Sequence, residues 1–240
     1  MKKIYFVGAG GIGMAALERY YLSQGYKVAG YDRTPSPLTD ALQHEGVAIS
    51  FEDSMDAVPG DFRDPATTEV VYTPAVPDDN IPLGFFRHNG FRLLKRAAVL
   101  GNITRSSLGL CFAGTHGKTT TSSMLSEILL HAKMDPTLSI GGILKTIGGN
   151  IRVGKSEYFV TEACEYTNSF LSFFPKIGII LNIEEDHLDF FKDLADIRRS
   201  FRKFAELLPE DGCLVINADI ADCQEITQGL ACRVITFGSG

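Results

Sequence analysis

Residues 3–22 read KIYFVGAGGIGMAALERYYL, which is a short apolar run, a cluster of glycines and then an amphipathic stretch. The cluster contains the pattern G-x-G-x-x-G with one additional glycine. Such a loop between a strand and a helix lets backbone N–H groups approach a diphosphate, whose charge the helix N-terminus favours. Asp32, at the end of the next predicted strand, is placed to accept hydrogen bonds from a ribose. We therefore predict a dinucleotide or nucleoside diphosphate site formed by Gly8, Gly10, Gly11, Ile12, Gly13 and Asp32.

The same loop also has an interpretation that needs no ligand. Glycines at these positions let a helix pack closely on a strand, whatever the site binds. The pattern also does not distinguish NAD from another nucleotide diphosphate. At the level of this loop both alternatives stay open.

A second glycine loop, GTHGKTTT at residues 114–121, follows the apolar run LGLCFA and opens a predicted helix. Lys118 is expected to face solvent and to reach β- and γ-phosphates, and Thr119 is of the type that binds Mg²⁺. The spacing G-x-x-G-K-T is two residues shorter than in a standard P-loop, which would place a glycine at Phe112. A simple capped helix is the alternative without a ligand. We predict ATP binding by Gly114, Thr115, His116, Gly117, Lys118, Thr119 and Thr120.

The presence of two such loops narrows the class of function. A dehydrogenase needs the first loop and has no use for the second, whereas a plain ATPase leaves the first loop unexplained. An ATP-driven enzyme that acts on a nucleotide-linked substrate uses both loops.

Acidic residues and a histidine follow two further predicted strands. EACEY occupies residues 162–166, and NIEEDHLD occupies residues 182–189. Carboxylates at the carboxyl ends of parallel strands lie where an α/β sheet binds its ligands. Oxygen ligands with one imidazole suit Mg²⁺ or Mn²⁺ held against a triphosphate. The alternative is a solvated acidic face with helix-terminal charges, and His187 taken alone is equally typical of a capping or solvated residue.

Strands and helices alternate along the chain, which predicts an α/β fold with mostly parallel sheets. In the first half we expect strands over 3–7, 27–31, 47–51 and 69–73, with helices over 12–24 and 35–45. In the second half we expect strands over 108–113, 158–161, 177–181, 214–216 and 234–236, with helices over 118–133 and 190–208. A boundary in the 101–107 region gives a Rossmann-like domain over 1–105 and a P-loop-type ATPase domain over 106–240.

The composition excludes several classes of protein. The 240 residues are 45% hydrophobic and 22% charged, as in an ordinary globular protein. A net charge of −6 argues against a general nucleic-acid-binding surface. No apolar run approaches the roughly 18 residues of a membrane span, so we expect no membrane insertion. The five cysteines form no C-x-x-C pair and fit a reduced, cytoplasmic compartment best.

The motifs taken together resemble those of the Mur ligases. The resemblance rests on the first glycine loop, on GTHGKTTT, on EACEY and on NIEEDH, and it runs from residue 3 to about residue 237. Arg96, within LKRAAVL at residues 94–100, also fits the family's link between its first and second domains. The members that add L-alanine to UDP-N-acetylmuramate are the most similar.

The resemblance implies three domains, which bind the UDP-sugar, ATP and the incoming amino acid in that order. It implies that Gly8 to Gly13 and Asp32 hold UDP and not NAD. It also implies catalytic roles for Lys118, Glu162 and His187, with Thr119 on a first Mg²⁺ and with Glu162 and His187 on a second metal. The implied reaction is ATP-driven joining of L-alanine to UDP-N-acetylmuramate through an acyl phosphate, in peptidoglycan synthesis. The third domain is expected to be missing from this chain, which alone is then expected to be inactive.

Two positions depart from the family pattern. Cys164 stands where many members have Asp, and Arg202 stands where sister ligases carry a carbamylated lysine, with Lys203 one position further on. Three alternatives stay open. One is the ligase that recycles a whole tripeptide onto UDP-N-acetylmuramate, and a second is folylpolyglutamate synthetase, which does not begin with a UDP-binding glycine loop. The third is a UDP-sugar and ATP binding module without ligase activity.

Overall fold

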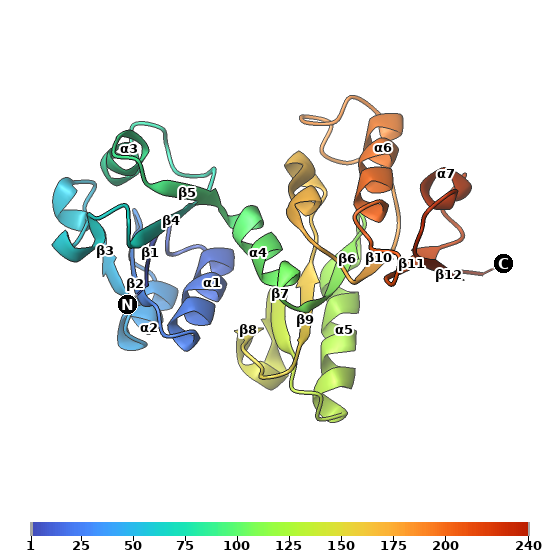
Figure 1. Ribbon diagram of the computed structural model, residues 1–240, viewed down its shortest axis with the longest axis horizontal. Helices are drawn as coiled ribbons and strands as arrows, with labels where there is room; N and C mark the ends of the chain where they lie inside the picture. Colours follow the sequence, from blue (N-terminus) through green and yellow to red (C-terminus); the bar gives the residue numbers. More distant parts are fainter. Residues whose placement is uncertain (1, 240) are drawn as a thin grey trace. The chain divides into compact units, whose positions relative to one another are not determined.

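Two separate, mostly parallel β-sheets organise the computed structural model, which describes residues 2–239 (Figure 1). Each sheet belongs to its own compact unit, Met1–Val99 and Leu100–Gly240. The expected α/β fold class is therefore confirmed. The division between the units falls within the helix α4 (Arg96–Arg105), a little before the expected 105/106 boundary.

The first sheet has five parallel strands in the order β3-β2-β1-β4-β5. The strand order reverses between β1 and β4, and such a reversal opens a crevice at the carboxyl ends of the two strands. The elements in chain order are β1 (Lys3–Val7), α1 (Ile12–Ser23), β2 (Lys27–Tyr31), α2 (Pro37–His44), β3 (Ala48–Ser50), the 3₁₀ turns η1 (Met55–Ala57) and η2 (Gly60–Phe62), β4 (Thr68–Tyr72), α3 (Ile81–His88) and β5 (Arg92–Lys95).

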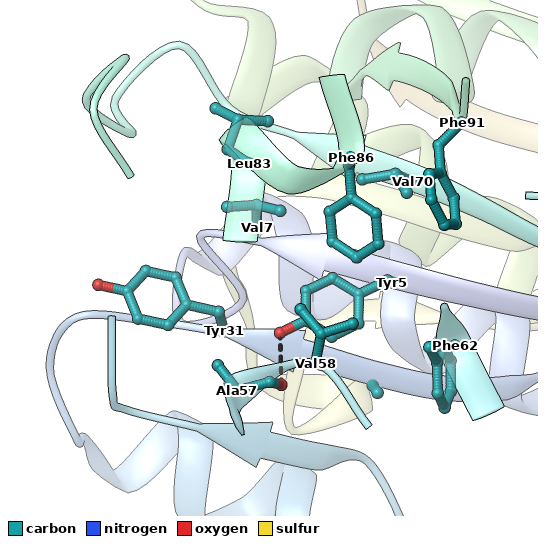
Figure 2. Packing of buried hydrophobic residues seen from close by; sticks show 11 residues of the cluster. Tyr5, Val7, Tyr31, Ala57, Val58, Phe62, Val70, Leu83, Phe86 and Phe91 are labelled. Atoms are coloured by element: carbon teal, nitrogen blue, oxygen red, sulfur yellow. Dashed lines mark hydrogen bonds between the residues drawn. The ribbon is translucent and has the colours of Figure 1, made fainter. Parts of the chain in front are cut away.

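Side chains alternate along β1 and so fill both faces of this sheet. Tyr5 points into a buried cluster formed with side chains of η1, η2 and α3, including Phe62 (Figure 2). The Tyr5 hydroxyl donates to the Ala57 carbonyl at 2.8 Å, which satisfies the buried phenol (Figure 2). Phe6 points to the opposite face, where its ring centroid lies 6.3 Å from that of Tyr21 on α1. The first sheet is thus covered by α1 on one face and by α3 with the 3₁₀ turns on the other.

The helix α1 also buries a carboxylic acid. Glu18 is 0% exposed, and neither of its carboxyl oxygens has a hydrogen-bond partner within residues 2–239. Burial raises the pKa of Glu18 well above its ordinary value; Arg19 opposes this shift, whereas Asp32 and Glu45 add to it. The folded chain therefore favours the neutral acid.

The second sheet has seven strands in the order β12-β11-β10-β6-β9-β7-β8. Its neighbouring strands run parallel except β7 and β8, which form an antiparallel pair. The elements are β6 (Leu108–Ala113), α5 (Lys118–His131), β7 (Thr137–Leu144), η3 (Lys145–Ile147), β8 (Gly149–Arg152), β9 (Tyr158–Glu162), η4 (Tyr166–Ser172), β10 (Ile177–Ile180), α6 (Leu194–Ala205), β11 (Cys213–Asn217), α7 (Gln224–Thr227) and β12 (Arg233–Phe237).

The helices α5 and α6 cover opposite faces of this second sheet (Figure 1). On one face, Leu129 of α5 packs in a buried cluster with Phe112 of β6. On the other face, Phe204 of α6 stacks on Phe170, with ring centroids 5.0 Å apart. Gly178 of β10 lies under α6, because a Cβ there would be 3.4 Å from the Phe204 ring. Both faces of the central strands are therefore buried, as expected of parallel strands, whereas the edge strand β12 is exposed.

The expected strands and helices are present, with ends that differ by a few residues. The helix expected over 190–208 begins later, at Leu194, because Asp193 caps it by accepting the Asp196 N–H at 2.7 Å. The sequence patterns did not predict α3, α4, α7, β5 or the β7–β8 hairpin. Asn80, which caps α3, and Pro82 in its first turn were signals that favoured that helix.

Within residues 2–239, none of the helices combines the length and the apolar character needed to cross a membrane.

Candidate functional site

A cavity of about 860 Å³ opens in the first unit at the carboxyl ends of β1 and β4. This is the crevice where the strand order reverses, which is the usual ligand position in an open α/β sheet. The glycine loop after β1 forms one wall, and the segment after β4 forms another. Residues that line it include Gly8, Gly11, Gly13, Asp32, Thr73, Val76 and Arg96.

Asp32 fixes the glycine loop. Its Oδ2 accepts the Gly10 N–H at 2.6 Å, and its Oδ1 accepts the Thr34 N–H at 3.0 Å. A Cβ on Gly10 would lie 2.9 Å from the Asp32 carboxyl carbon, so this approach requires glycine. Asp32 also lines the cavity, where its remaining acceptor capacity is open to a hydroxyl donor. The carboxylate thus has a structural role in addition to the ribose contact expected of it.

Arg96 places a positive charge beside the start of α1. A Cβ on Gly13 would collide with Arg96 Nη1, which shows that the guanidinium lies directly over this glycine. The N-terminus of α1 adds its own positive potential to the same wall. The positive charge of the guanidinium and the positive potential of the helix N-terminus together favour the binding of a diphosphate. Ile12, expected at the same site, lies in the first turn of α1 with 54% of its surface exposed.

One polar wall of the cavity was not predicted. Asp53 Oδ1 accepts from Asn80 Nδ2 and from the Ile81 N–H, both at 2.8 Å. Asp53, Asn80 and Tyr31 all line the cavity. Burial raises the pKa of Tyr31, and the nearby carboxylate of Asp53 adds to this shift. These groups supply hydrogen-bond donors and acceptors at fixed positions.

A second group of polar residues gathers at the carboxyl ends of three neighbouring strands of the second sheet. The glycine loop follows β6, Glu162 ends β9, and Asn182 follows β10. The loop turns through Gly114 and Gly117, whose φ angles of 141° and 85° favour glycine. The helix α5 begins immediately afterwards at Lys118.

Asn182 holds this loop in place. Its Oδ1 accepts the His116 N–H at 2.7 Å, its Nδ2 donates to the His116 carbonyl at 3.0 Å, and its own carbonyl accepts the Thr115 N–H at 3.3 Å. Two loop amides are therefore already used within the protein. The first four amides of a helix have no partner inside it, so donors remain from Gly117 to Thr120. An anion would bind there, at the positive end of α5.

Lys118 is more buried than the sequence analysis expected. Only 15% of its side chain is exposed, and its Nζ donates to Glu165 Oε2 at 3.0 Å, to the Thr115 carbonyl at 3.2 Å and to the Gly114 carbonyl. The expectation of a solvent-facing lysine is wrong, because the turn after β9 brings the Glu165 carboxylate beneath the loop. Glu165 itself is 3% exposed at its side chain.

Glu162 accepts hydrogen bonds from three donors. These are Thr119 Oγ1 at 3.1 Å, Ser122 Oγ at 3.3 Å and the Gly141 N–H at 2.6 Å. The Thr119 hydroxyl and the Glu162 carboxylate are oxygen ligands of the kind that Mg²⁺ prefers. They lie side by side at the start of α5, where a phosphate would bind. These two residues therefore fit a magnesium ion.

His187 belongs to a different part of this site. The carboxylates within 4 Å of its ring nitrogens are those of Glu165, at 3.9 Å from Nε2, and of Asp186, at 3.8 Å from Nδ1, rather than that of Glu162. Its ring packs on Tyr166 with centroids 4.5 Å apart, and its φ of 53° is unusual for a residue other than glycine. Across residues 2–239, no three Asp, Glu, His or Cys side chains form a ready metal-binding group.

Four residues that shape this site were not predicted from the sequence. Glu165 and Asn182 lay inside quoted motifs without a role of their own. Ser122 stands one helical turn after Thr119 and so shares its face, which helical spacing predicts. Gly141 gave no signal, since it lies on the unpredicted strand β7.

Two family models match nearly the whole chain. The Mur ligase family catalytic domain matches residues 3–107, and the Mur ligase middle domain matches residues 112–240. The two matched segments carry the first and the second glycine loop, respectively.

Curated relatives match over both units. The UDP-N-acetylmuramate–L-alanine ligase of Lachnospira eligens is 52% identical over 237 residues, which cover 98% of this chain and 50% of the relative. The enzyme of the same name from Clostridium novyi is 49% identical and is matched over 99% of this chain and 51% of its own length. The chain thus spans about half the length of the curated relatives it matches.

Solved structures match the fold as well. The UDP-N-acetylmuramate-alanine ligase of Thermotoga maritima gives a TM-score of 0.82 at 31% identity, covering 100% of this chain and 53% of that one. The UDP-N-acetylmuramate:L-alanyl-gamma-D-glutamyl-meso-diaminopimelate ligase of Neisseria meningitides gives 0.88 at 26% identity, covering 99% of this chain and 78% of that one. With both units and both glycine loops inside the matched segments, the chain belongs to the Mur ligase family.

Proposed function

We propose that this chain forms the UDP-sugar-binding and ATP-binding parts of a cytoplasmic ligase that joins L-alanine to UDP-N-acetylmuramate in peptidoglycan synthesis. The observation that carries the proposal is the pairing of two glycine loops, each at the carboxyl ends of its own parallel sheet. Identity of 52% to a UDP-N-acetylmuramate–L-alanine ligase supports the choice of substrates. Residues 1–105 take the UDP-sugar in this proposal, and residues 106–240 take ATP.

In the first unit, the cavity beside β1 and β4 holds the UDP of the substrate. The diphosphate lies at the N-terminus of α1, against the backbone of Gly8 to Gly13 and the Arg96 guanidinium. Asp32 accepts hydrogen bonds from the ribose while it keeps the loop closed through Gly10. The volume of about 860 Å³ is ample for a nucleotide-sized ligand.

In the second unit, the loop from Gly114 to Thr120 holds the ATP phosphates. Lys118 and the free amides of the first turn of α5 neutralise phosphate charge. Thr119 and Glu162 would hold Mg²⁺, and His187 would add a ligand for a second metal ion. When bound, Mg²⁺ withdraws charge from the phosphate oxygens.

The proposed reaction makes an amide from a carboxylate, which is a poor electrophile until it is activated. The lactyl carboxylate of UDP-N-acetylmuramate attacks the γ-phosphorus of ATP, giving an acyl phosphate and ADP. The amine of L-alanine then attacks the acyl carbon, loses a proton and expels phosphate. Lys118 acts in the first step, where charge builds up on the oxygens of the transferring phosphoryl group.

Calorimetric titration tests the ligand assignment. We expect the chain to bind UDP-N-acetylmuramate and Mg²⁺–ATP with separate heats, and to give no response to NAD. Arg96→Ala should weaken the first ligand alone, and Thr119→Ala should weaken the second alone. Binding of NAD without any response to UDP-N-acetylmuramate or UDP would overturn the assignment and favour a dehydrogenase.

The tripeptide-recycling ligase is the second candidate, because the Neisseria enzyme gives the higher TM-score, 0.88 against 0.82. Turnover by a protein that carries this chain within its full length separates the two. We expect L-alanine to be the better amine substrate and the peptide L-alanyl-γ-D-glutamyl-meso-diaminopimelate to be the poorer one. The reverse preference would assign the recycling reaction.

A further inference from the structure

A buried carboxylate beneath the second glycine loop has no place in the function proposed above. Glu165 lies three residues beyond Glu162, and its side chain is 3% exposed. A carboxylate withdrawn from water this far costs free energy unless a cation or several donors meet it. Glu165 meets Lys118, with Oε2 at 3.0 Å and Oε1 at 3.3 Å from Nζ.

The amine of Lys118 has its full set of acceptors in this arrangement. An ammonium group has three N–H donors. Lys118 directs them to the Gly114 carbonyl, the Thr115 carbonyl and the Glu165 carboxylate. The amine is therefore fixed against its own loop at one defined place. A phosphate oxygen that bound the amine would have to replace one of these three acceptors.

The chain around Glu165 is anchored on both sides, so its carboxylate has little freedom. Before it, the Ala163 N–H donates to the Phe112 carbonyl of β6 at 2.8 Å. After it, the Asn168 N–H donates to the Glu165 carbonyl at 2.8 Å, and the Asn168 side chain bonds Ser200 of α6. Thr167, next to Asn168, has a left-handed φ of 54°, a conformation that a β-branched residue keeps only where its surroundings impose it.

We propose that Glu165 is a positioning residue, which holds the Lys118 amine against its loop and keeps it in place when a phosphate oxygen replaces one of the two carbonyl acceptors. Glu165 holds the amine whether or not a ligand is bound, and only the binding of a phosphate rests on the proposed function. Because Glu165 stays paired with the amine, its buried carboxylate keeps its cation throughout.

The reactivity of the Lys118 amine tests the holding directly. Brief reductive methylation followed by peptide mass spectrometry gives a rate for each lysine in the folded chain. Lys133, which is exposed two residues beyond the end of α5, serves as the internal reference. We expect Lys118 to react at least about tenfold more slowly than Lys133. The amine reacts only when it has left its acceptors, and breaking one charge-assisted hydrogen bond lowers the population of free amine by roughly that factor.

Three variants separate positioning from general effects. Glu165→Gln should raise the Lys118 rate about tenfold while the Lys133 rate stays constant. Glu165→Asp, which keeps the charge but draws it back from the amine, should give an intermediate rate. Glu185→Gln removes the same charge from an exposed position in the neighbouring loop and should leave the Lys118 rate unchanged.

Several outcomes would overturn the proposal. One is a Lys118 rate equal to that of Lys133 in the unsubstituted chain, a result that needs no variant to fold. Another is a Glu165→Gln rate unchanged from that of the unsubstituted chain. A third is an equal rise in Glu185→Gln. A separate experiment measures whether Mg²⁺–ATP protects Lys118 by slowing its methylation. If the holding is observed and this protection is absent, the ATP assignment fails and the positioning role of Glu165 stands.

Discussion

At the scale of single residues, Glu18 makes the stability of the first unit depend on pH. Its pKa is raised in the folded chain, so the folded state keeps its proton over a range where the unfolded chain has lost it. Below the ordinary pKa of about 4.3 both states are protonated and no penalty exists. As the pH rises from there toward the raised pKa, the free energy of unfolding falls by about 1.4 kcal/mol per pH unit.

Glu18→Gln removes this titration and tests it. We expect the variant to gain stability relative to the unsubstituted chain as the pH rises from 5 to 8, with little difference near pH 4. Urea denaturation at several pH values measures the effect. Glu52→Gln, at an exposed position of the same unit, serves as the control and should leave the pH profile unchanged. A difference between Glu18→Gln and the unsubstituted chain that stays constant with pH would contradict the account.

Lys118 is expected to contribute to the stability of the fold as well as to ATP binding. Lys118→Ala would leave the Glu165 carboxylate buried without its cation, which costs up to about 3–5 kcal/mol of stability. We therefore expect a marked fall in the free energy of unfolding, measured in urea, together with loss of ATP binding. The double variant Lys118→Ala/Glu165→Gln should recover much of the stability and none of the binding. A loss within about 0.5 kcal/mol, as for an exposed side chain, would show that the pair is not formed in solution.

At the scale of elements, strand β7 shapes the second site through Gly141, where it passes Glu162. A Cβ at Gly141 would lie 2.6 Å from Glu162 Oε2, so Gly141→Ala must push the carboxylate away from Thr119. We expect weaker Mg²⁺–ATP binding by calorimetry, with a smaller effect on ATP in the absence of the metal. Gly149→Ala in strand β8 is the matched control, since nothing lies within 4 Å of a Cβ there. Equal affinities in the two variants would remove Glu162 from the metal site.

The elements that the sequence did not predict are those whose signals are weak or non-local. The strands β1, β2 and β6 are uninterrupted apolar runs beside glycine turns, which is typical of buried parallel strands. The strand β7 reads TLSIGGIL, and its two glycines break the pattern because they make room for neighbouring groups. Its pairing with β8 is antiparallel, so it also departs from the alternation that predicted the remainder of the sheet.

The residues of the candidate sites likewise fall into those that local sequence patterns indicated and those that they did not. Motif spacing indicated the two loops, and the ends of predicted strands indicated Asp32 and Glu162, because each of these residues directly follows or ends an apolar run. The pairing of Lys118 with Glu165 joins positions 47 residues apart and depends on β9 lying beside β6. The Asp53–Asn80 wall similarly joins a loop to the cap of α3. Contacts of this kind are set by strand order, which local patterns do not encode.

At the scale of the whole molecule, the activity of the 240 residues taken alone is a separate question from ligand binding. In the three-domain organisation implied by the family resemblance, the amino acid is bound outside the two domains proposed here. Without a positioned amine, the reaction loses a proximity term on the order of 7–11 kcal/mol. We expect the chain to bind both phosphorylated ligands and to form no UDP-N-acetylmuramoyl-alanine. Incubation with UDP-N-acetylmuramate, ATP, Mg²⁺ and labelled alanine measures this, and product at an ordinary enzymatic rate would contradict it.

The strand order of the second sheet also bears on how the protein is made. β6 and its glycine loop are synthesised first, whereas the strands that flank β6, β9 and β10, begin only at Tyr158 and Ile177. Pairing across such separations is slow, since long loops must close before the contacts form. On the ribosome, the loop therefore emerges with neither neighbour in place, and its clamp residue Asn182 has yet to be translated. A nascent chain stalled before Tyr158 exposes an apolar strand on both edges, which makes it a target for chaperones.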